Sequence, residues 1–299
     1  FEFTDIAGLV SGASKGEGLG NKFLSHIREV DAICEVVRCF ENKDVIHVED
    51  SVDPIRDVEI IDLELILSDL EIVLNRLNKI GKKANLSKDS DVIFEYNLLN
   101  KIKTSLEQNI PLRKVSLEEK EIEFIKPFNF ITLKPIIYIA NVGEDDILNG
   151  SNVYVEKLKK YAEVEQSSVV VLCAKMESEL SELNEEDKEA FLKELNISST
   201  GLNKMIKSTY DLLGLATYFT VGSDEVRAWT FKKGMKAPKC AGIIHTDFER
   251  GFIKAEIMSF DDLYSFGDEK KVRENGRVRL EGKDYIMQDG DICHFRFNV

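Results

Sequence analysis

The chain of 299 residues is longer than one typical domain, so we expect two or three domains. Its composition, with 43% hydrophobic and 31% charged residues, is that of a globular protein, and no apolar run is long enough to cross a membrane. The five cysteines follow no metal-ligand or disulfide spacing, and the start does not resemble a signal peptide. We therefore expect reduced thiols in a cytoplasmic protein.

The net charge of −14 is distributed unevenly. Residues 216–299 contain 14 basic and 14 acidic residues, so residues 1–215 carry the whole excess, with 26 basic and 40 acidic residues. Such a step in charge indicates a domain boundary near residue 215. An acidic first part argues against broad, non-specific nucleic-acid binding, because the phosphate backbone attracts Lys and Arg. A local basic site in the second part stays open.

The first residues predict a strand followed by a phosphate-binding turn. Phe1 and Phe3 alternate with polar residues as in a strand, which ends at Asp5. Ligand groups of an open α/β sheet lie just beyond the carboxyl ends of its strands, so Asp5 is placed to hold Mg²⁺ through water. Gly8 has no side chain to keep a phosphate away from its backbone amide. The alternative is that Asp-x-x-Gly is an ordinary turn after a strand.

The sequence contains no Gly-x-x-x-x-Gly-Lys-Ser/Thr segment. If the first domain binds phosphate, we expect a strand–P-loop–helix unit of roughly 30 residues to precede residue 1. Without that unit the chain lacks the amide cradle, the phosphate-reaching lysine and the Mg²⁺-holding hydroxyl. It should then bind nucleotide weakly or not at all and be inactive. Whether the unit is missing from the protein or only from this sequence stays open.

Residues 57–127 predict a helical hairpin. Apolar residues spaced by three and four positions form a heptad seam, which comprises Ile60, Leu63, Leu67, Leu70, Leu74 and Leu77. Gly81 should end this helix, and a second helix should run up to Pro111. A short link between two helices makes them antiparallel. Burial of the seam inside the hairpin is favoured over dimerisation.

Three apolar runs predict strands of a mostly parallel sheet. They cover residues 31–40, 134–144 and 167–175, and helical segments alternate with them on both sides of the hairpin. This order is typical of an α/β sheet with an insertion. After residue 214, strand-like runs at 218–221, 226–231, 283–286 and 292–297, separated by turn signals, predict a small β-rich domain.

Three predicted strand ends carry residues suited to nucleotide chemistry. The first has Asp5 and Gly8, the second has Asn141, Val142 and Glu144, and the third has Cys173, Ala174 and Lys175. In that order they match the third, fourth and fifth motifs of P-loop GTPases, which are Asp-x-x-Gly, Asn-x-x-Asp/Glu and Ser/Cys-Ala-Lys. Each motif is weak alone, whereas the ordered set at strand ends is a strong signal.

Longer segments resemble the Obg-related ATPases of the YchF type, within the P-loop GTPase superfamily. The similar segments are 5–10, 12–24, 37–42, 138–142, 226–230, 245–253 and 295–299, so the resemblance covers the whole chain. It implies a partial Obg-type G domain in 1–56 and 128–213, a helical hairpin insertion in 57–127, and a ubiquitin-like β-grasp TGS domain in 214–299. It also implies ATP, Mg²⁺, ATP hydrolysis and association with ribosomes.

The residues themselves give a reason for ATP in preference to GTP. In the guanine-reading motif Asn-Lys-x-Asp, the Asp accepts hydrogen bonds from guanine N1–H and N2–H₂. Here Val142 replaces the stacking Lys and the carboxylate of Glu144 is one methylene longer, so the guanine contact should be lost or displaced. Asn141 can still bond a purine edge, and Val142 can pack on the ring. Gly143 stands where the family often has a polar residue.

Leu9 occupies the position whose side chain usually orients the attacking water. Ordinary GTPases have Gln directly after Asp-x-x-Gly, and a Leu side chain cannot bond a water. His47 is our candidate for that catalytic role, because it lies in a loop after a strand and imidazole titrates near neutral pH. The alternative is a packing or surface histidine.

Two other functions stay open. One is a GTPase of the same superfamily, which the residues after Asn141 disfavour. The other is a nucleotide-regulated ribosome- or RNA-binding switch with little turnover, which Leu9 favours. A basic run of Lys232, Lys233, Lys236 and Lys239 could contact RNA phosphate or form a solvated loop of the TGS domain. We expect a monomer that does not associate with a membrane.

Overall fold

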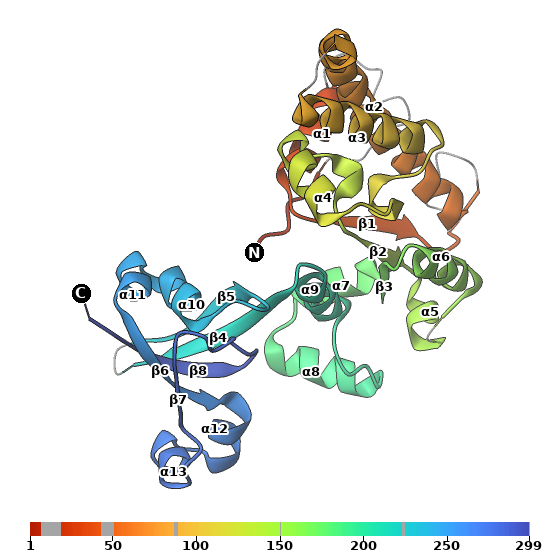
Figure 1. The fold of residues 1–299 in the computed structure, drawn as a ribbon. Coiled ribbons are helices and arrows are strands. Elements are labelled where there is room, and N and C mark those ends of the chain that lie inside the picture. The colour runs from red at the N-terminus through yellow and green to blue at the C-terminus, as the bar shows by residue number, and fades with distance from the viewer. Residues whose placement is uncertain (7–18, 43–50, 87–88, 150, 223–224, 299) are drawn as a thin grey trace. The chain divides into compact units, whose positions relative to one another are not determined.

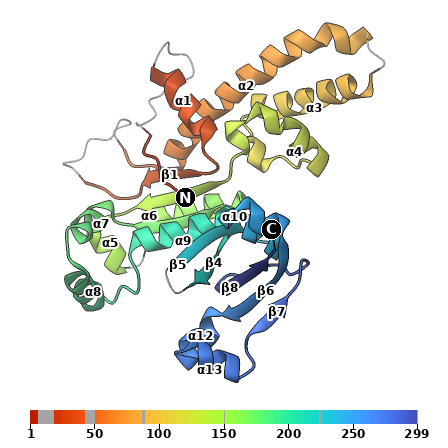
Figure 2. The ribbon, with the colours of Figure 1, turned by 90° about the vertical axis from the view of Figure 1, so that its left-hand side faces the viewer.

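The computed structural model describes residues 1–6, 19–42, 51–86, 89–149, 151–222 and 225–298. Within these ranges the chain forms two compact units, Phe1–Ser208 and Thr209–Val299, and each unit contains its own sheet (Figures 1 and 2). None of the helices in these ranges is long and apolar enough to cross a membrane.

A three-stranded parallel sheet forms the centre of the first unit. Its strands are β1 (Ile33–Arg38), β2 (Ile136–Asn141) and β3 (Ser168–Leu172), in the order β1-β2-β3. All residues of β2 from Ile136 to Ala140 are buried, which explains why this strand is a continuous apolar run. The prediction of an α/β protein with a parallel sheet is therefore confirmed.

Helices precede, connect and follow these strands. They are α1 (Leu19–Glu29) before β1, α5 (Glu144–Asn149) and α6 (Val153–Val164) between β2 and β3, and α7 (Ala174–Ser181), α8 (Glu185–Glu194) and α9 (Gly201–Leu212) after β3. Val155, Leu158 and Ala162 of α6 are spaced by three and four residues, so they share one helix face. This face packs against β2 in the core of the unit.

Residues 1–6 form no regular secondary structure, so the strand predicted to end at Asp5 is absent. A strand needs a neighbour to bond its backbone, and among the described residues β1 pairs with β2 alone. Phe1 and Phe3 instead contact each other edge to face, with ring centroids 5.1 Å apart, and both are exposed. The alternation of polar and apolar residues in this segment predicted the two faces of a strand, but it did not identify a second strand that could pair with it.

A long helical hairpin is inserted between β1 and β2. Its helices α2 (Pro54–Leu86) and α3 (Ser90–Glu107) lie side by side (Figure 2) and are followed by η2 (Leu112–Lys114), α4 (Glu119–Ile125), η3 (Lys126–Phe128) and η4 (Ile131–Leu133). Gly81 does not end α2, contrary to the prediction. A glycine inside a helix costs only about 1 kcal/mol, which packing against α3 can offset.

The buried seam of α2 shares Leu70 and Leu77 with the predicted seam and differs from it at the other positions. Its buried and half-buried members are Ile66, Leu70, Val73, Leu77 and Ile80, which pack against Leu98, Leu99 and Ile102 of α3. Leu63 and Leu74 of the predicted seam are 41% and 38% exposed. Both sets have heptad spacing, so the sequence pattern alone cannot choose between them.

Asp69 of α2 is a buried carboxylate that joins three segments. Its Oδ1 accepts hydrogen bonds from the Ile131 amide at 3.1 Å and from Arg28 Nη1 of α1 at 3.0 Å. Its Oδ2 accepts from the Thr132 amide and hydroxyl, each at 2.8 Å. Four donors therefore compensate the burial of one charge, and they fix α1 and η4 to the middle of α2.

Arg113 of η2 joins the hairpin to the sheet through a buried cluster of ion pairs. Its Nη2 donates to the carboxylate of Asp62 in α2, at 2.7 and 2.6 Å, and its Nε donates to Glu165 at 3.3 Å. Glu165 follows α6 and also accepts from the Tyr138 hydroxyl of β2 at 2.7 Å. The Arg113 and Glu165 side chains are 8% and 0% exposed. Removing one partner of such a buried pair typically costs about 3–5 kcal/mol.

Glu35 of β1 lies beside this cluster without bonding to it. Its Oε2 atom is buried and has no hydrogen-bond partner in the described ranges. Burial, and then the nearby charge of Asp62, raise the pKa of Glu35 well above its ordinary value of 4.5. The pKa of Glu165 is shifted the other way: burial disfavours its charge, but Lys114 and Arg113 hold the pKa below the ordinary value.

Glu35→Gln should make the protein more stable at pH values well above 4.5. A raised pKa means that Glu35 contributes stability below pH 4.5 and that this contribution is lost as the pH rises through its folded-state pKa. Glutamine cannot ionise, so the decline with pH should become shallower. The measurement is the free energy of unfolding by urea across a pH series.

Glu165→Gln should act in the opposite direction and lower stability at neutral pH. A lowered pKa stabilises the fold above 4.5, and this stabilisation is lost as the pH falls. Glu123→Gln, on the exposed surface of α4, is the matched control. If all three variants gave the same pH profile, the buried cluster would not control this dependence.

A five-stranded mixed sheet forms the second unit. Its order is β5-β4-β8-β6-β7, and only β4 and β8 are parallel neighbours. The elements are β4 (Leu215–Val221), β5 (Val226–Lys232), α10 (Ala237–Ile244), α11 (Thr246–Arg250), β6 (Phe252–Ser259), α12 (Phe260–Phe266), α13 (Glu269–Glu274), β7 (Arg279–Glu281) and β8 (Asp291–Phe297). Strand β6 was not predicted from the sequence, and residues 283–286, expected as a strand, contribute one bridge between Ile286 and Lys236.

Tyr218 of β4 lies at the centre of this unit. Its ring contacts Phe231 and Phe295 edge to face, with centroid distances of 5.8 Å, and its hydroxyl donates to the Cys240 carbonyl at 2.8 Å. The buried phenol thus has a partner for its polar atom as well as for its ring. Cys240 and Cys293 are buried in the same core, and burial raises the pKa of the Cys240 thiol to about 12.

Candidate nucleotide-binding site

The carboxyl ends of β1, β2 and β3 lie at one edge of the parallel sheet. Arg38 pairs with Asn141, and Asn141 pairs with Leu172, so the residues that follow β2 and β3 are neighbours. In open α/β sheets this edge is where ligands bind. The structure therefore brings together two groups of residues predicted to bind the nucleotide, Asn141 to Glu144 at the end of β2 and Cys173 to Lys175 after β3. We call this the base side of the site.

Asn141 fastens these two loops together. Its Oδ1 accepts a hydrogen bond from the Ala174 amide at 3.0 Å, at the start of α7. One residue further on, the Val142 amide donates to the Leu172 carbonyl at 2.9 Å. The Asn141 side chain thus positions the Cys173–Ala174 backbone, a role that differs from the purine-edge contact predicted for it.

Val142 is 2% exposed and belongs to the apolar core under the sheet edge. Its side chain therefore does not lie on an open surface where a base ring could rest, contrary to the expectation that it packs on the ring. The cause is local: the residue continues the pairing of β2 by one position, so its side chain points into the core. Cys173 is buried as well, at the N-terminus of α7.

Glu144 and Lys175 form an exposed ion pair across the two loops. Lys175 Nζ lies 3.1 and 3.2 Å from the two carboxylate oxygens of Glu144. This hydrogen bond, together with the charges of Glu144 and Glu179, raises the pKa of Lys175. The carboxylate that would accept from guanine is therefore engaged by a cation of the protein, and a guanine would have to compete with it.

Two further residues position this edge and were missed from the sequence. Asn152 Nδ2 donates to the Cys39 carbonyl after β1, at 2.7 Å, and its Oδ1 caps α6. Glu177 of α7 accepts from the Gly201 and Leu202 amides at 2.6 and 3.2 Å, which fixes the start of α9. The Asn152 cap was readable as a signal before the helix, whereas the other contacts join residues far apart in the sequence.

The phosphate and metal side of the site is described only at Asp5. Asp5 is exposed, and no ligand-forming cluster of three or more His, Cys, Asp or Glu residues occurs in the described ranges. One exposed carboxylate does not by itself make a metal site. Gly8, Leu9 and His47 lie outside the described residues.

The chain is similar to a known protein family and to curated proteins from several bacteria. The family model YchF-GTPase_C, described as "Protein of unknown function (DUF933)", matches residues 215–298. A curated relative from Bacillus subtilis (strain 168), named ribosome-binding ATPase YchF, is 56% identical over 300 residues, which cover 100% of this chain and 82% of the relative. A relative of the same name from Escherichia coli O157:H7 is 48% identical over 298 residues, with 100% and 81% covered.

A solved structure is also similar. The Schizosaccharomyces pombe YchF GTPase superposes with a TM-score of 0.83 at 40% sequence identity, and the match covers 97% of this chain and 78% of that chain. The protein is thus an α/β protein with a parallel sheet, and its fold is similar to that of this structure. It belongs to the YchF family.

Asn141→Ala in the full-length protein should weaken nucleotide binding by about tenfold, because a hydrogen bond that positions the Ala174 backbone is lost. Isothermal titration calorimetry with ATP measures the change. Asn149→Ala, at the exposed end of α5, removes the same group without touching the two loops and should bind as the unchanged protein does. Equal losses in both variants would contradict a role of Asn141 in the site.

Proposed function

We propose that this protein binds ATP and hydrolyses it as part of a ribosome-associated activity. The observation that carries the proposal is the sheet edge where Asn141 joins the loops after β2 and β3 and Lys175 engages Glu144. The names of the curated relatives, ribosome-binding ATPase YchF, support both the reaction and the partner. A cytoplasmic monomer is part of the same proposal.

The domain assignment that fits this function is also a proposal. Residues 1–56 and 128–213 would form the P-loop-type G domain, 57–127 its helical insertion and 214–299 the TGS domain. A parallel sheet in the first unit, a hairpin between β1 and β2, and a mixed five-stranded sheet in the second unit support this assignment. In this scheme the nucleotide binds at the carboxyl edge of β1 to β3.

The residues on the base side of the site support a preference for ATP over GTP. Val142 provides no aliphatic-ammonium stem to cover the base, since its side chain is buried. The Glu144 carboxylate is held by Lys175, so acceptance from guanine N1–H and N2–H₂ would break an existing ion pair. Adenine carries no such pair of donors at this edge and makes no such demand. The Ala174 backbone and Asn141 are then the groups left to contact the purine.

ATP should bind the full-length protein more tightly than GTP, and Glu144→Asp should reduce the difference by about tenfold. The Asp carboxylate reaches Lys175 less well and has the length found in guanine-reading motifs. The charge-assisted hydrogen bond that it can then accept from guanine contributes about 1.5–3 kcal/mol to the binding of GTP. Calorimetric titration with both nucleotides tests this, and Asp145→Glu, also in α5, is the control. Equal affinities of the unchanged protein for ATP and GTP would disprove the proposed preference.

Asp5 is the residue that we propose for Mg²⁺, through a bound water. Mg²⁺ prefers oxygen ligands and keeps several of its waters, and an exposed carboxylate suits such an outer contact. When bound, the ion would neutralise charge that develops on the phosphates during transfer. Gly8 would contact a phosphate through its backbone amide. The assignments of Asp5 and Gly8 rest on the Asp-x-x-Gly motif.

His47 is proposed to orient or activate the attacking water. Leu9 cannot do so, whereas His47, which lies between β1 and α2 in the sequence, has an imidazole that can accept or donate a proton near neutral pH. The competing function is a nucleotide-regulated switch in which turnover is incidental, and Leu9 is the observation that favours it. A GTPase is disfavoured because Lys175 occupies the Glu144 carboxylate.

His47→Ala in the full-length protein should retain ATP affinity and lose about a hundredfold in turnover, the usual contribution of a general base or water-positioning group. Single-turnover hydrolysis and calorimetry separate the two quantities. His26→Ala, in α1, is a control that should change neither. Unchanged turnover in His47→Ala would exclude His47 and strengthen the switch.

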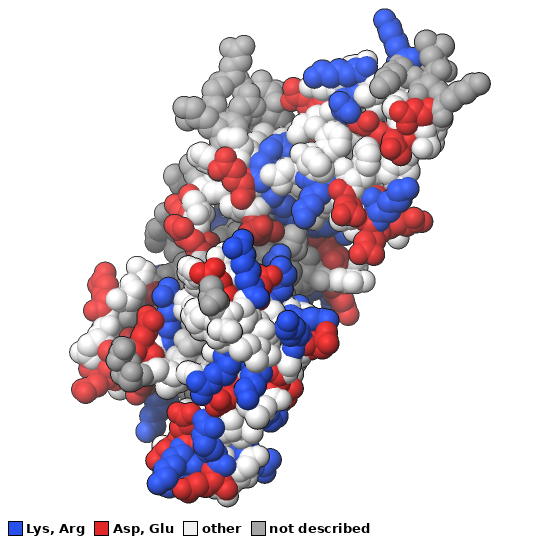
Figure 3. Space-filling model, turned by 60° about the vertical axis from the view of Figure 1, so that its left-hand side comes forward, with Lys and Arg blue, Asp and Glu red and all other residues white. Residues whose placement is uncertain are grey.

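An RNA contact through the second unit would use the basic run of Lys232, Lys233, Lys236 and Lys239. Three lysines of the basic run are engaged by carboxylates: Lys233 by Asp211 at 3.0 Å, Lys236 by Asp284 at 2.7 Å and Lys239 by Glu249 at 2.5 Å. Basic and acidic side chains are interspersed on the face shown in Figure 3. These observations favour the solvated-loop interpretation of the run and leave Lys232 as its one member without a described ion pair.

A further inference from the structure

The central strand of the second unit, β8, is paired on one side for longer than on the other. Its partner β6 pairs with it from Asp291 to Phe297. Its partner β4 pairs only with Ile292 and Cys293, through Phe219 and Thr220. Over residues 294–297 the backbone edge that faces β4 therefore has no strand partner in the described part of the chain. Bare strand edges are templates for pairing with another chain.

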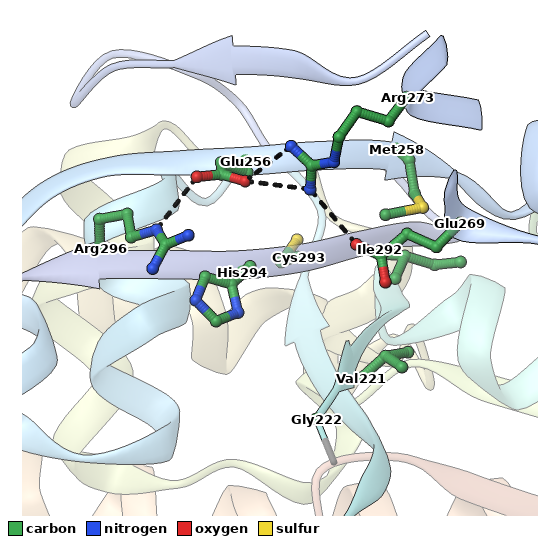
Figure 4. A pocket seen from close by; sticks show the side chains of 10 residues that line it. All are labelled: Val221, Gly222, Glu256, Met258, Glu269, Arg273, Ile292, Cys293, His294 and Arg296. Carbon is green, nitrogen blue, oxygen red and sulfur yellow. Dashed lines mark hydrogen bonds and ion pairs between the residues drawn. The ribbon is translucent and has the colours of Figure 1, made fainter. Parts of the chain in front are cut away.

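A crevice opens where β4 and β8 part. Two hollows of about 440 and 510 Å³ lie here, and both are lined by Val221, Gly222, Cys293, His294 and Arg296. Figure 4 shows Val221 at the end of β4 on one side and His294 with Arg296 of β8 on the other. Because the same residues line both hollows, the opening gives access to both faces of the sheet.

The two faces of the crevice differ in chemistry. One is ionic: Glu256 accepts from Arg296 Nε at 3.0 Å and from Arg273 at 3.3 Å, and Arg273 also bonds Glu269 at 3.4 Å (Figure 4). The other face is apolar and is lined by Trp229, Ile244, Phe248 and Phe297. There the Phe248 and Phe297 rings stack at a centroid distance of 3.9 Å.

We propose that this crevice binds an extended peptide segment of a partner protein, which adds to the free edge of β8. Successive side chains of an extended chain point to opposite faces, so the peptide would alternate apolar residues, on the aromatic face, with polar residues on the ionic face. One of these polar residues is a carboxylate beside Arg296. In the described residues the guanidinium uses only Nε for Glu256, which leaves its Nη donors for a further acceptor.

The charges favour a peptide over a nucleic acid. The lining contains Arg273 and Arg296 against Glu225, Glu256 and Glu269, so there is no excess of cations for a run of phosphates. A peptide backbone can satisfy the N–H and C=O groups of residues 294–297, whereas bases and phosphates cannot continue a β-ladder. This site lies in the second unit and does not depend on the proposed nucleotide chemistry.

The test uses the full-length protein and three labelled hexapeptides in fluorescence anisotropy. The first alternates, Thr-Val-Glu-Phe-Thr-Val. The second replaces Glu by Lys, and the third has the composition of the first in two blocks, Thr-Glu-Thr-Val-Phe-Val. We expect the alternating acidic peptide to bind at least about tenfold more tightly than either of the others, because only it satisfies both faces and Arg296. Hydrogen exchange at residues 294–297 should slow in its presence.

Arg296→Gln should abolish the preference for Glu over Lys in the peptide while the preference for alternation remains. Arg277→Gln, exposed in the same unit and absent from the crevice lining, should leave both preferences intact. Equal binding of the alternating and block peptides, no binding of any peptide, or an unchanged preference in Arg296→Gln would overturn the proposal. So would slowed exchange at 294–297 caused by a single-stranded RNA oligonucleotide rather than by the peptide.

Discussion

The ion pairs around Arg113 are the interaction on which the first unit depends. One guanidinium bridges Asp62 of the long helix α2 and Glu165 behind α6, and Glu165 is bonded in turn by Tyr138 of the central strand. A hairpin inserted between two strands could otherwise move against the sheet as a separate body. Because the charges are buried, separating them would leave each charge without water and without a partner, which costs free energy. The hairpin is thereby oriented by a few directional bonds as well as by apolar packing.

The sheet edge that carries the candidate site is built in a similar way, from single polar side chains that each join two loops. Asn141 joins the ends of β2 and β3, and Asn152 joins the end of β1 to the start of α6. These amides hold backbone groups in place without charge, so they leave the local electrostatics to Glu144 and Lys175. A nucleotide that arrives at this edge meets loops whose spacing is already set, which lowers the cost of ordering them.

The sequence predicted what is encoded locally. Apolar runs located β1, β2 and β3, and the motif residues Asn141 and Cys173 fall at adjacent strand ends. It failed where a choice depended on a distant partner. Residues 1–6 have strand-like alternation but pair with no strand in the described ranges, and α2 has two heptad registers of which α3 buries one. Val142 was expected at the base and is in the core. The catalytic assignment at His47 stays a prediction.

The start of α9 shows how little freedom such an arrangement leaves. A Cβ atom on Gly201 would lie 2.4 Å from Leu172 Cβ and 2.9 Å from Glu177 Oε1, far inside contact distance. Leu172 at the end of β3, Glu177 in α7 and Gly201 at the start of α9 are therefore packed so closely that no side chain fits between them. Any substitution at 201 must push α9 away from the loop that begins at Cys173. A single hydrogen atom in place of a side chain thus sets the distance between the base-side loop and the helix that leads out of the first unit.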